Sequence, residues 1–195
     1  MLICYKTITI IMKKIFFALI IVAACSSPQR EESSASMAPL QEWDANQKLA
    51  DLGITLPEAS APVANYVNAV RTGNLIFLAG KGPKKADGTY ITGKVGVNLT
   101  VEEGYEAAKL TGINQLAVLK AELGDLNKVK RIIKVKGMVN CAPDFGNQPE
   151  VVNGYSDLMV AVFGVKGKHA RAAVGMGSLP RGIAVEVEMV VEVEE

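Results

Sequence analysis

The last strand-like segment of the chain constrains the fold most strongly. Between positions 183 and 193 every second residue is apolar, namely Ile183, Val185, Val187, Met189, Val191 and Val193. Successive side chains of a β-strand point to opposite faces, so these six share one face, and that face must be buried. The residues between them include Glu186 and Glu188, so the other face is mixed in polarity. The chain therefore needs a second layer that covers one side of a sheet.

Other strand signals precede this segment. Runs rich in β-branched and aromatic residues at 66–70 and 75–79 flank residues 71–74, whose Gly-Asn pair suits a tight hairpin turn. Residues 129–139 are β-rich with basic residues interleaved, as expected of a strand with one face in water, and a further strand is predicted at 170–176.

Two helices are predicted between the strands. Thr100 and Glu103 form a capping box at the start of the first helix, which runs to Leu123 and is ended by Gly124. The second fits residues 150–163 and is ended by a glycine. The order ββ-α-β-α-ββ predicts an α+β fold, with one mixed sheet and both helices on one face.

The first 25 residues resemble an export signal. Lys13 and Lys14 precede ten apolar residues at 15–24, whereas a membrane-spanning helix needs about 20. Small residues then lead into Cys25, which resembles a bacterial lipobox, where the cysteine is acylated and becomes the new N-terminus. We expect a lipid anchor at Cys25 and a place in the outer membrane or periplasm. A buried cysteine after a short core helix is the alternative, and Met12 is an alternative start.

Two segments separate this signal from the main domain. Residues 26–43 are small and polar, and we expect a flexible tether there. Asp44 can cap a short helix from Ala45 to Leu52, so residues 44–61 are predicted to be an accessory helix and linker. The domain proper is then expected at 62–195.

Charge and composition argue against several functions. Lys and Arg number 21 against 20 Asp and Glu, a formal charge of +1, and loss of residues 1–24 would leave −2. Neither value favours a nucleic-acid partner. The single histidine, His169, and three cysteines at positions 4, 25 and 141 provide little for a zinc site or a Ser-His-Asp triad. We expect no metal, no cofactor and no disulfide within the domain.

The C-terminal part of the chain carries a recognisable signature. Ala170-Arg171-Ala172-Ala173-Val174 is followed by Leu179-Pro180 and by Val185-Glu186-Val187-Glu188. These segments resemble the signature of the RidA/YjgF family, also called the endoribonuclease L-PSP or chorismate-mutase-like family.

The resemblance extends upstream. Asn65-Tyr66-Val67 resembles the family's first strand, Leu78-Ala79-Gly80-Lys81-Gly82-Pro83 its Ser-Gly-Gln-x-Pro turn, and Val152-Asn153 the start of its second helix. About residues 62–195 are covered, and the sequence is similar to the longer YjgF-like branch.

The resemblance implies a chorismate-mutase-like homotrimer, with a barrel-like core of sheets and ligand clefts between subunits. It also implies hydrolysis of enamines and imines, such as 2-aminoacrylate, to a 2-oxo acid and ammonia. By match to the family, Arg171 binds the carboxylate of the ligand, Glu186 holds the attacking water, and Gly80 contacts the ligand through its backbone. Tyr66 and Asn153 match positions that line the cleft, the latter across a one-residue length difference.

The spacing of Arg171 and Glu186 supports a shared site independently. An antiparallel hairpin centred on Ser178 and Leu179 would place the two opposite each other. A guanidinium gives a carboxylate two parallel donors, and a nearby glutamate can orient a water and accept its proton. On residue types alone, however, such a pair is more often a plain cross-strand ion pair.

Alternative interpretations apply to the other candidates. Tyr66 can be an aromatic at a strand edge and Gly80 a turn glycine. His169 is interpreted as an exposed loop residue, and Cys141 as a small buried apolar one.

Two departures from the family pattern bear on activity. Ala173 stands where a cysteine is common, and Lys81 stands where the turn has glutamine. Export would also separate the protein from cytoplasmic sources of 2-aminoacrylate.

Three functions stay open: an enamine or imine deaminase, an endoribonuclease, and a non-catalytic binder of small carboxylates or 2-oxo acids. The mature charge of −2 and the lack of a basic aromatic stripe disfavour the second.

Overall fold

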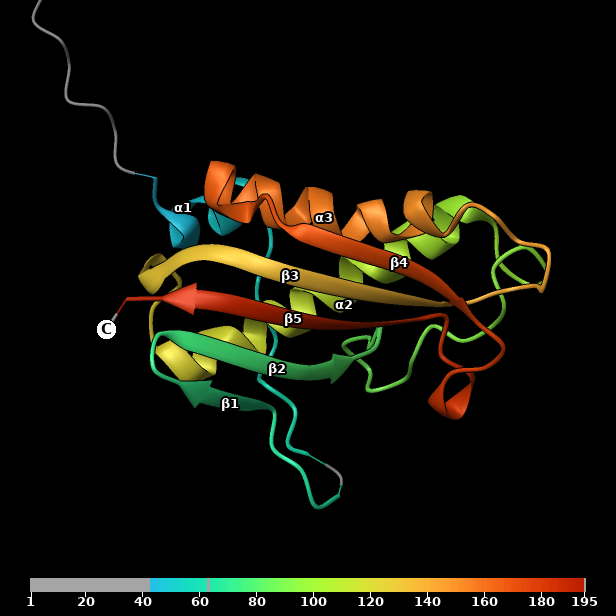
Figure 1. The fold of residues 1–195 in the computed structure, drawn as a ribbon, viewed down its shortest axis with the longest axis horizontal. Helices are drawn as coiled ribbons and strands as arrows, with labels where there is room; N and C mark the ends of the chain where they lie inside the picture. Colours follow the sequence, from blue (N-terminus) through green and yellow to red (C-terminus); the bar gives the residue numbers. More distant parts are fainter. Residues whose placement is uncertain (1–42, 63, 195) are drawn as a thin grey trace, which may run out of the picture. The chain divides into compact units, whose positions relative to one another are not determined.

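The computed structural model describes residues 43–62 and 64–194 (Figure 1). Cys25, the predicted export signal and nearly all of the predicted tether lie outside these residues. The helices and strands are α1 (Ala45–Asp51), β1 (Ala69–Thr72), β2 (Leu75–Lys81), α2 (Val101–Leu123), β3 (Val129–Asn140), α3 (Gln148–Phe163), β4 (Ala170–Met176) and β5 (Val185–Val193). Short 3-10 turns lie at Leu126–Lys128, Gly164–Gly167 and Pro180–Gly182. None of the helices described is long and apolar enough to cross a membrane.

The strands form one sheet in the order β1-β2-β5-β3-β4. All neighbours are antiparallel except β3 and β4, which are parallel. Figure 1 shows α2 and α3 along one side of this sheet, with α3 beside β3 and β4. The predicted mixed sheet with two helices on one face is confirmed.

The apolar face of β5 forms the centre of the core. The five alternating residues of the strand, from Val185 to Val193, are buried in the main core, and the strand lies between β2 and β3. Ile183 precedes the strand and is buried in a separate cluster with Met138 and Leu179, so the prediction that it shares this face is wrong. At the start of α2, the Thr100 hydroxyl accepts from the Glu103 amide at 3.1 Å and the Glu103 carboxylate accepts from the Thr100 amide at 2.8 Å. Both N-terminal donors are therefore satisfied as the capping box predicts.

Helix α1 packs onto the same fold. Asp44 accepts hydrogen bonds from two backbone amides at the start of α1, as predicted for a cap. Ala45 and Leu49 are buried in the main core. Trp43 donates its indole N–H to the Val162 carbonyl of α3 at 2.8 Å.

Two strand predictions are wrong. The first strand begins at Ala69 rather than at 66, so Tyr66 lies before it and is exposed. The hairpin between 170–176 and 183–193 does not form, because β3 separates β4 from β5. The intervening residues 177–184, which contain a 3-10 turn, carry the chain past the end of β3.

The other face of the sheet carries exposed apolar side chains. Val70 pairs with Phe77, and Phe77 pairs with Val190, so the three form a row across β1, β2 and β5. Val70, Phe77, Val174 and Met176 are each more than a third exposed. We call Val70, Phe77, Val190, Val174 and Met176 the open face of the sheet.

Candidate active site

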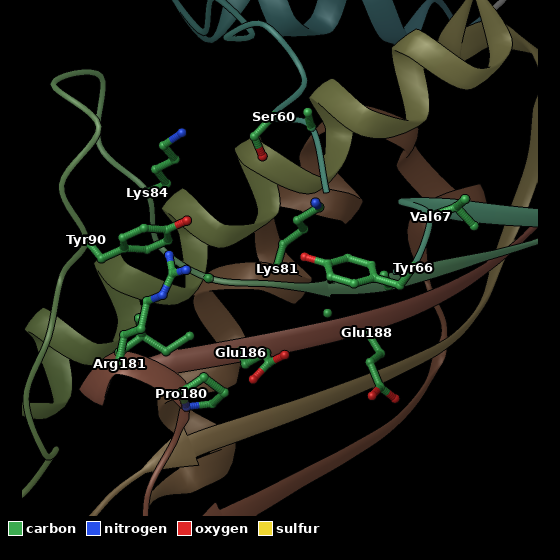
Figure 2. A pocket seen from close by; sticks show the side chains of 15 residues that line it. Ser60, Tyr66, Val67, Lys81, Lys84, Tyr90, Pro180, Arg181, Glu186 and Glu188 are labelled. Atoms are coloured by element: carbon green, nitrogen blue, oxygen red, sulfur yellow. The ribbon is translucent and has the colours of Figure 1, made fainter. Parts of the chain in front are cut away.

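A cavity of about 610 Å³ lies beside β2 and the start of β5 (Figure 2). Polar and charged side chains on its wall are Ser60, Tyr66, Lys81, Lys84, Tyr90, Arg181, Glu186 and Glu188. Three of the residues predicted for the site, Tyr66, Gly80 and Glu186, line this one cavity.

Gly80 lies directly against the Glu186 carboxylate. A Cβ atom at Gly80 would overlap Glu186 Oε1 and would lie 3.0 Å from Glu186 Cδ. Gly80 belongs to β2 rather than to a turn, so the interpretation as a turn glycine is wrong. The missing side chain lets the carboxylate lie on the backbone of the neighbouring strand.

We therefore expect Gly80→Ala to displace the Glu186 carboxylate while the fold survives. If Glu186 takes part in catalysis, turnover of the substrate should fall by about 10-fold or more, as expected when a catalytic group is misplaced. The melting temperature checks folding, and Gly146→Ala is the matched control, because no atom lies within 4 Å of a Cβ at that position. Full activity of Gly80→Ala would show that the position of this carboxylate does not matter.

The surroundings of Glu186 favour its protonated form. Burial raises the pKa of Glu186, the like charge of Glu188 raises it further, and Lys136 opposes the shift. Glu188 itself pairs with Lys136 at 3.5 Å. A carboxylate with a raised pKa is a stronger base once it has ionised, so Glu186 is suited to taking a proton from water.

Lys81 lies at the same wall of the cavity. Its ammonium donates to Asn68 Oδ1 at 2.6 Å, and Asn68 donates to the Ser60 carbonyl at 2.8 Å. Burial lowers the pKa of Lys81, and the nearby Lys84 lowers it further. Figure 2 shows the Tyr66 hydroxyl directed toward the Lys81 end of the cavity.

Arg171 and Asn153 form a second group, at the side of α3 that faces β4. The Arg171 guanidinium donates to Asn153 Oδ1 at 2.8 Å and to Ser156 Oγ at 3.1 Å. It also donates to the Pro149 carbonyl at 3.4 Å. The residues that line the cavity around Glu186 include neither Arg171 nor Asn153.

His169 supports this second group. It lies in the loop before β4, as predicted, but it is half-buried rather than exposed. Its Nδ1 lies 2.7 Å from the Gly167 carbonyl, which can only accept, so Nδ1 carries a proton. In the neutral ring, Nε2 then accepts from the Ser156 hydroxyl at 3.0 Å. Burial lowers the pKa of His169, and the positive charge of Arg171 lowers it further. The hydrogen bond to the Gly167 carbonyl opposes both effects. Ser156 thereby turns a lone pair toward Arg171.

Within one chain, Arg171 and Glu186 do not face each other. Their strands lie on either side of β3, where Val135 pairs with Arg171 and Met138 pairs with Glu186. The predicted cross-strand arrangement is wrong for this reason. The two residues form no ion pair among those found in the described part of the chain, so that interpretation is wrong as well.

Sequence reasoning missed several residues of the cavity around Glu186 and of the group around Arg171. Ser156 follows Asn153 by one helical turn, a spacing that places both on one face of α3 and could have identified it. His169 and Arg171 are two apart in an extended segment and could have been grouped in the same way. Arg181 and Tyr90 carry no comparable signal, because loops bring them to the cavity. Cys141 is buried, as predicted.

Comparison with known proteins agrees with this architecture. Residues 46–192 match the family described as "YjgF/chorismate mutase-like, putative endoribonuclease". Protein TCP17 of Trypanosoma cruzi is 46% identical over 142 residues, which are 72% of this chain and 89% of that protein. A 2-iminobutanoate/2-iminopropanoate deaminase of Mus musculus is 30% identical over 138 residues, covering 70% and 87%.

A solved structure shows the same fold. The crystal structure of a protein of unknown function from Agrobacterium tumefaciens is 42% identical, with a TM-score of 0.72. The match covers 78% of this chain and 93% of that one. Together with the family match over more than half of the sequence, this places the chain in the YjgF/chorismate mutase-like family.

Proposed function

We propose that this protein hydrolyses reactive 2-imino or enamino acids to 2-oxo acids and ammonia. The observation that carries the proposal is the Glu186 carboxylate, held against Gly80 in a cavity that raises its pKa. The mouse relative named as a 2-iminobutanoate/2-iminopropanoate deaminase supports the same class of reaction.

In this mechanism Glu186 orients a water and accepts a proton as the oxygen attacks the imine carbon. An enamino acid first takes a proton on carbon and becomes the imine. Glu186 passes this first water proton to the imine nitrogen, which gives a tetrahedral amino alcohol. The hydroxyl proton, the second proton of the water, then moves to the nitrogen, which leaves as ammonia. The C–N bond breaks as the C=O bond forms, and no oxidant or cofactor is required.

Arg171 would reach this cavity from a neighbouring copy of the chain. It lies on the edge strand β4, whereas Tyr66 lies just before β1, at the opposite edge of the sheet. A closed three-fold ring brings such opposite edges of adjacent copies together. The open face of the sheet, with its exposed apolar side chains, supports a buried trimer core. Light scattering tests the trimer, and a monomer at micromolar concentration would contradict it.

The direct test of function is ammonia release from imines generated in situ by amino-acid oxidation. The proposal expects faster ammonia release than in the absence of protein, with loss of the effect in Glu186→Gln. Binding of 2-oxo acids without turnover of any imine would favour the non-catalytic binder instead. RNA cleavage abolished by Glu186→Gln would favour the endoribonuclease that the family description names.

The acid limb of the activity profile should move when Glu188 is changed. The base must be ionised, so activity falls as the pH drops through the pKa of Glu186, which is raised above its usual range. Glu188→Gln removes a like charge and frees Lys136, and both changes lower the pKa of Glu186. We expect the acid limb of kcat/KM to shift to lower pH. A shift to higher pH, or none, would contradict Glu186 as the base.

We further propose that Cys25 is acylated and anchors the protein to the outer membrane. The lysine pair, the short apolar run and the small residues before Cys25 support this. Metabolic labelling with a fatty acid should mark the wild type and not Cys25→Ala. An unlabelled wild type, or one that fractionates as cytosolic, would contradict the anchor.

A further inference from the structure

Arg181 adopts a backbone conformation that L-residues rarely occupy. Its φ is +57°, and all other positive φ values in the described residues belong to glycines. Such conformations cost energy and are concentrated at functional sites. Here the residue is an arginine on the cavity wall, in the turn between β4 and β5, and Figure 2 shows its guanidinium at the Tyr90 side of the cavity.

The guanidinium has no partner of its own among the described residues. No hydrogen bond or ion pair of Arg181 is found there, although the guanidinium carries five N–H donors. Arg171, by contrast, donates to three oxygen atoms on α3. The donors of Arg181 are therefore available to a ligand in the cavity.

Lys81 adds a second cation to the same space. Its ammonium makes one hydrogen bond, to Asn68, and no ion pair within the described part of the chain, which leaves two N–H donors. Three cations, Lys81, Lys84 and Arg181, share the cavity with two carboxylates, one of which pairs with Lys136. The low hydration that lowers the pKa of Lys81 also strengthens its attraction for a bound anion.

We infer that the cavity binds a second anionic group of the substrate through Arg181 and Lys81, so that the preferred ligands are 2-imino or 2-oxo dicarboxylates. This rests on the proposed function, in which Arg171 of a neighbouring copy holds the carboxylate next to the reacting carbon. A single-carboxylate ligand would leave the Arg181 and Lys81 donors unused. The fork of Arg181 suits a planar carboxylate, and Lys81 supplies a point charge beside it.

The test compares the affinity of the full trimer for 2-oxobutanoate and for 2-oxoglutarate by calorimetry. These 2-oxo acids have the shape of the imines but are not hydrolysed, and only the second carries a distal carboxylate. We expect 2-oxoglutarate to bind about 10-fold more tightly, in the range for a charge-assisted hydrogen bond. Arg181→Gly, which suits the positive φ, should abolish this preference and leave 2-oxobutanoate affinity unchanged. Lys81→Gln should reduce the preference, and Lys85→Gln, on an exposed residue outside the cavity wall, should not.

The outcomes separate this inference from the proposed function. Equal affinity of the wild type for both ligands, or an unchanged preference in Arg181→Gly, overturns the second anion site alone. Loss of both affinities in a folded Arg181→Gly assigns Arg181 a structural role and also overturns it. A wild type that binds neither ligand overturns the proposed function and this inference together.

Discussion

Glu186→Gln is expected to reduce turnover of an imine substrate by about 100-fold or more while ligand binding persists. Glutamine keeps the size and hydrogen bonding of glutamate but cannot accept a proton, and a general base typically contributes this much. The residue is half-buried on β5 with its carboxylate against Gly80. Ammonia release gives turnover, and calorimetry with a 2-oxo acid gives binding.

The matched control is Glu192→Gln, which makes the same change on the same strand. Glu192 lies outside the cavity wall, where its partly buried carboxylate pairs with Arg131 at 2.7 Å and accepts from Asn74 at 3.1 Å. The melting temperature of Glu192→Gln checks that the fold is kept. Its turnover should match the wild type. Equal turnover in Glu186→Gln and Glu192→Gln would exclude Glu186 as the base.

Local patterns predicted most of the elements because their causes are local. The capping box fixes the start of α2, and glycines with positive φ follow the ends of α2 and α3 at Gly124 and Gly164. The alternation at 183–193 identifies a strand with one buried face. None of these patterns specifies which strands pair, so the position of β5 between β2 and β3 could not be read from them.

The same distinction between local patterns and strand pairing applies to the residues of the site. Gly80 and Glu186 were identified by resemblance, and the structure brings them together through the pairing of β2 with β5. The expected pairing of Arg171 with Glu186 assumed that strands adjacent in sequence are adjacent in the sheet. A residue such as Arg181 depends on the path of one loop, and no periodicity or motif reports that path.

Arg171→Lys is expected to weaken binding of a 2-oxo acid by about 2–3 kcal/mol, roughly 30-fold to 150-fold, without unfolding the protein. Lysine keeps the charge but cannot present two parallel donors, and it cannot make all three hydrogen bonds that Arg171 makes to Asn153, Ser156 and the Pro149 carbonyl. The control is Arg131→Lys, the same change on the exposed part of β3. Unchanged affinity in Arg171→Lys would remove the arginine from the binding site.

Mixed assemblies of two impaired variants test where the arginine comes from. We suppose that Arg171 of one copy completes the cavity of the next. In a ring of coexpressed variants, an intact site then forms wherever Arg171 of a Glu186→Gln chain lies at the cavity of an Arg171→Lys chain, which keeps Glu186. About one site in four is then intact in a random ring, and activity should recover to roughly that fraction of the wild type. If one chain supplied both residues, no combination would contain an intact site. Coexpression without recovery, in rings shown to contain both chains, would therefore contradict a site shared between subunits.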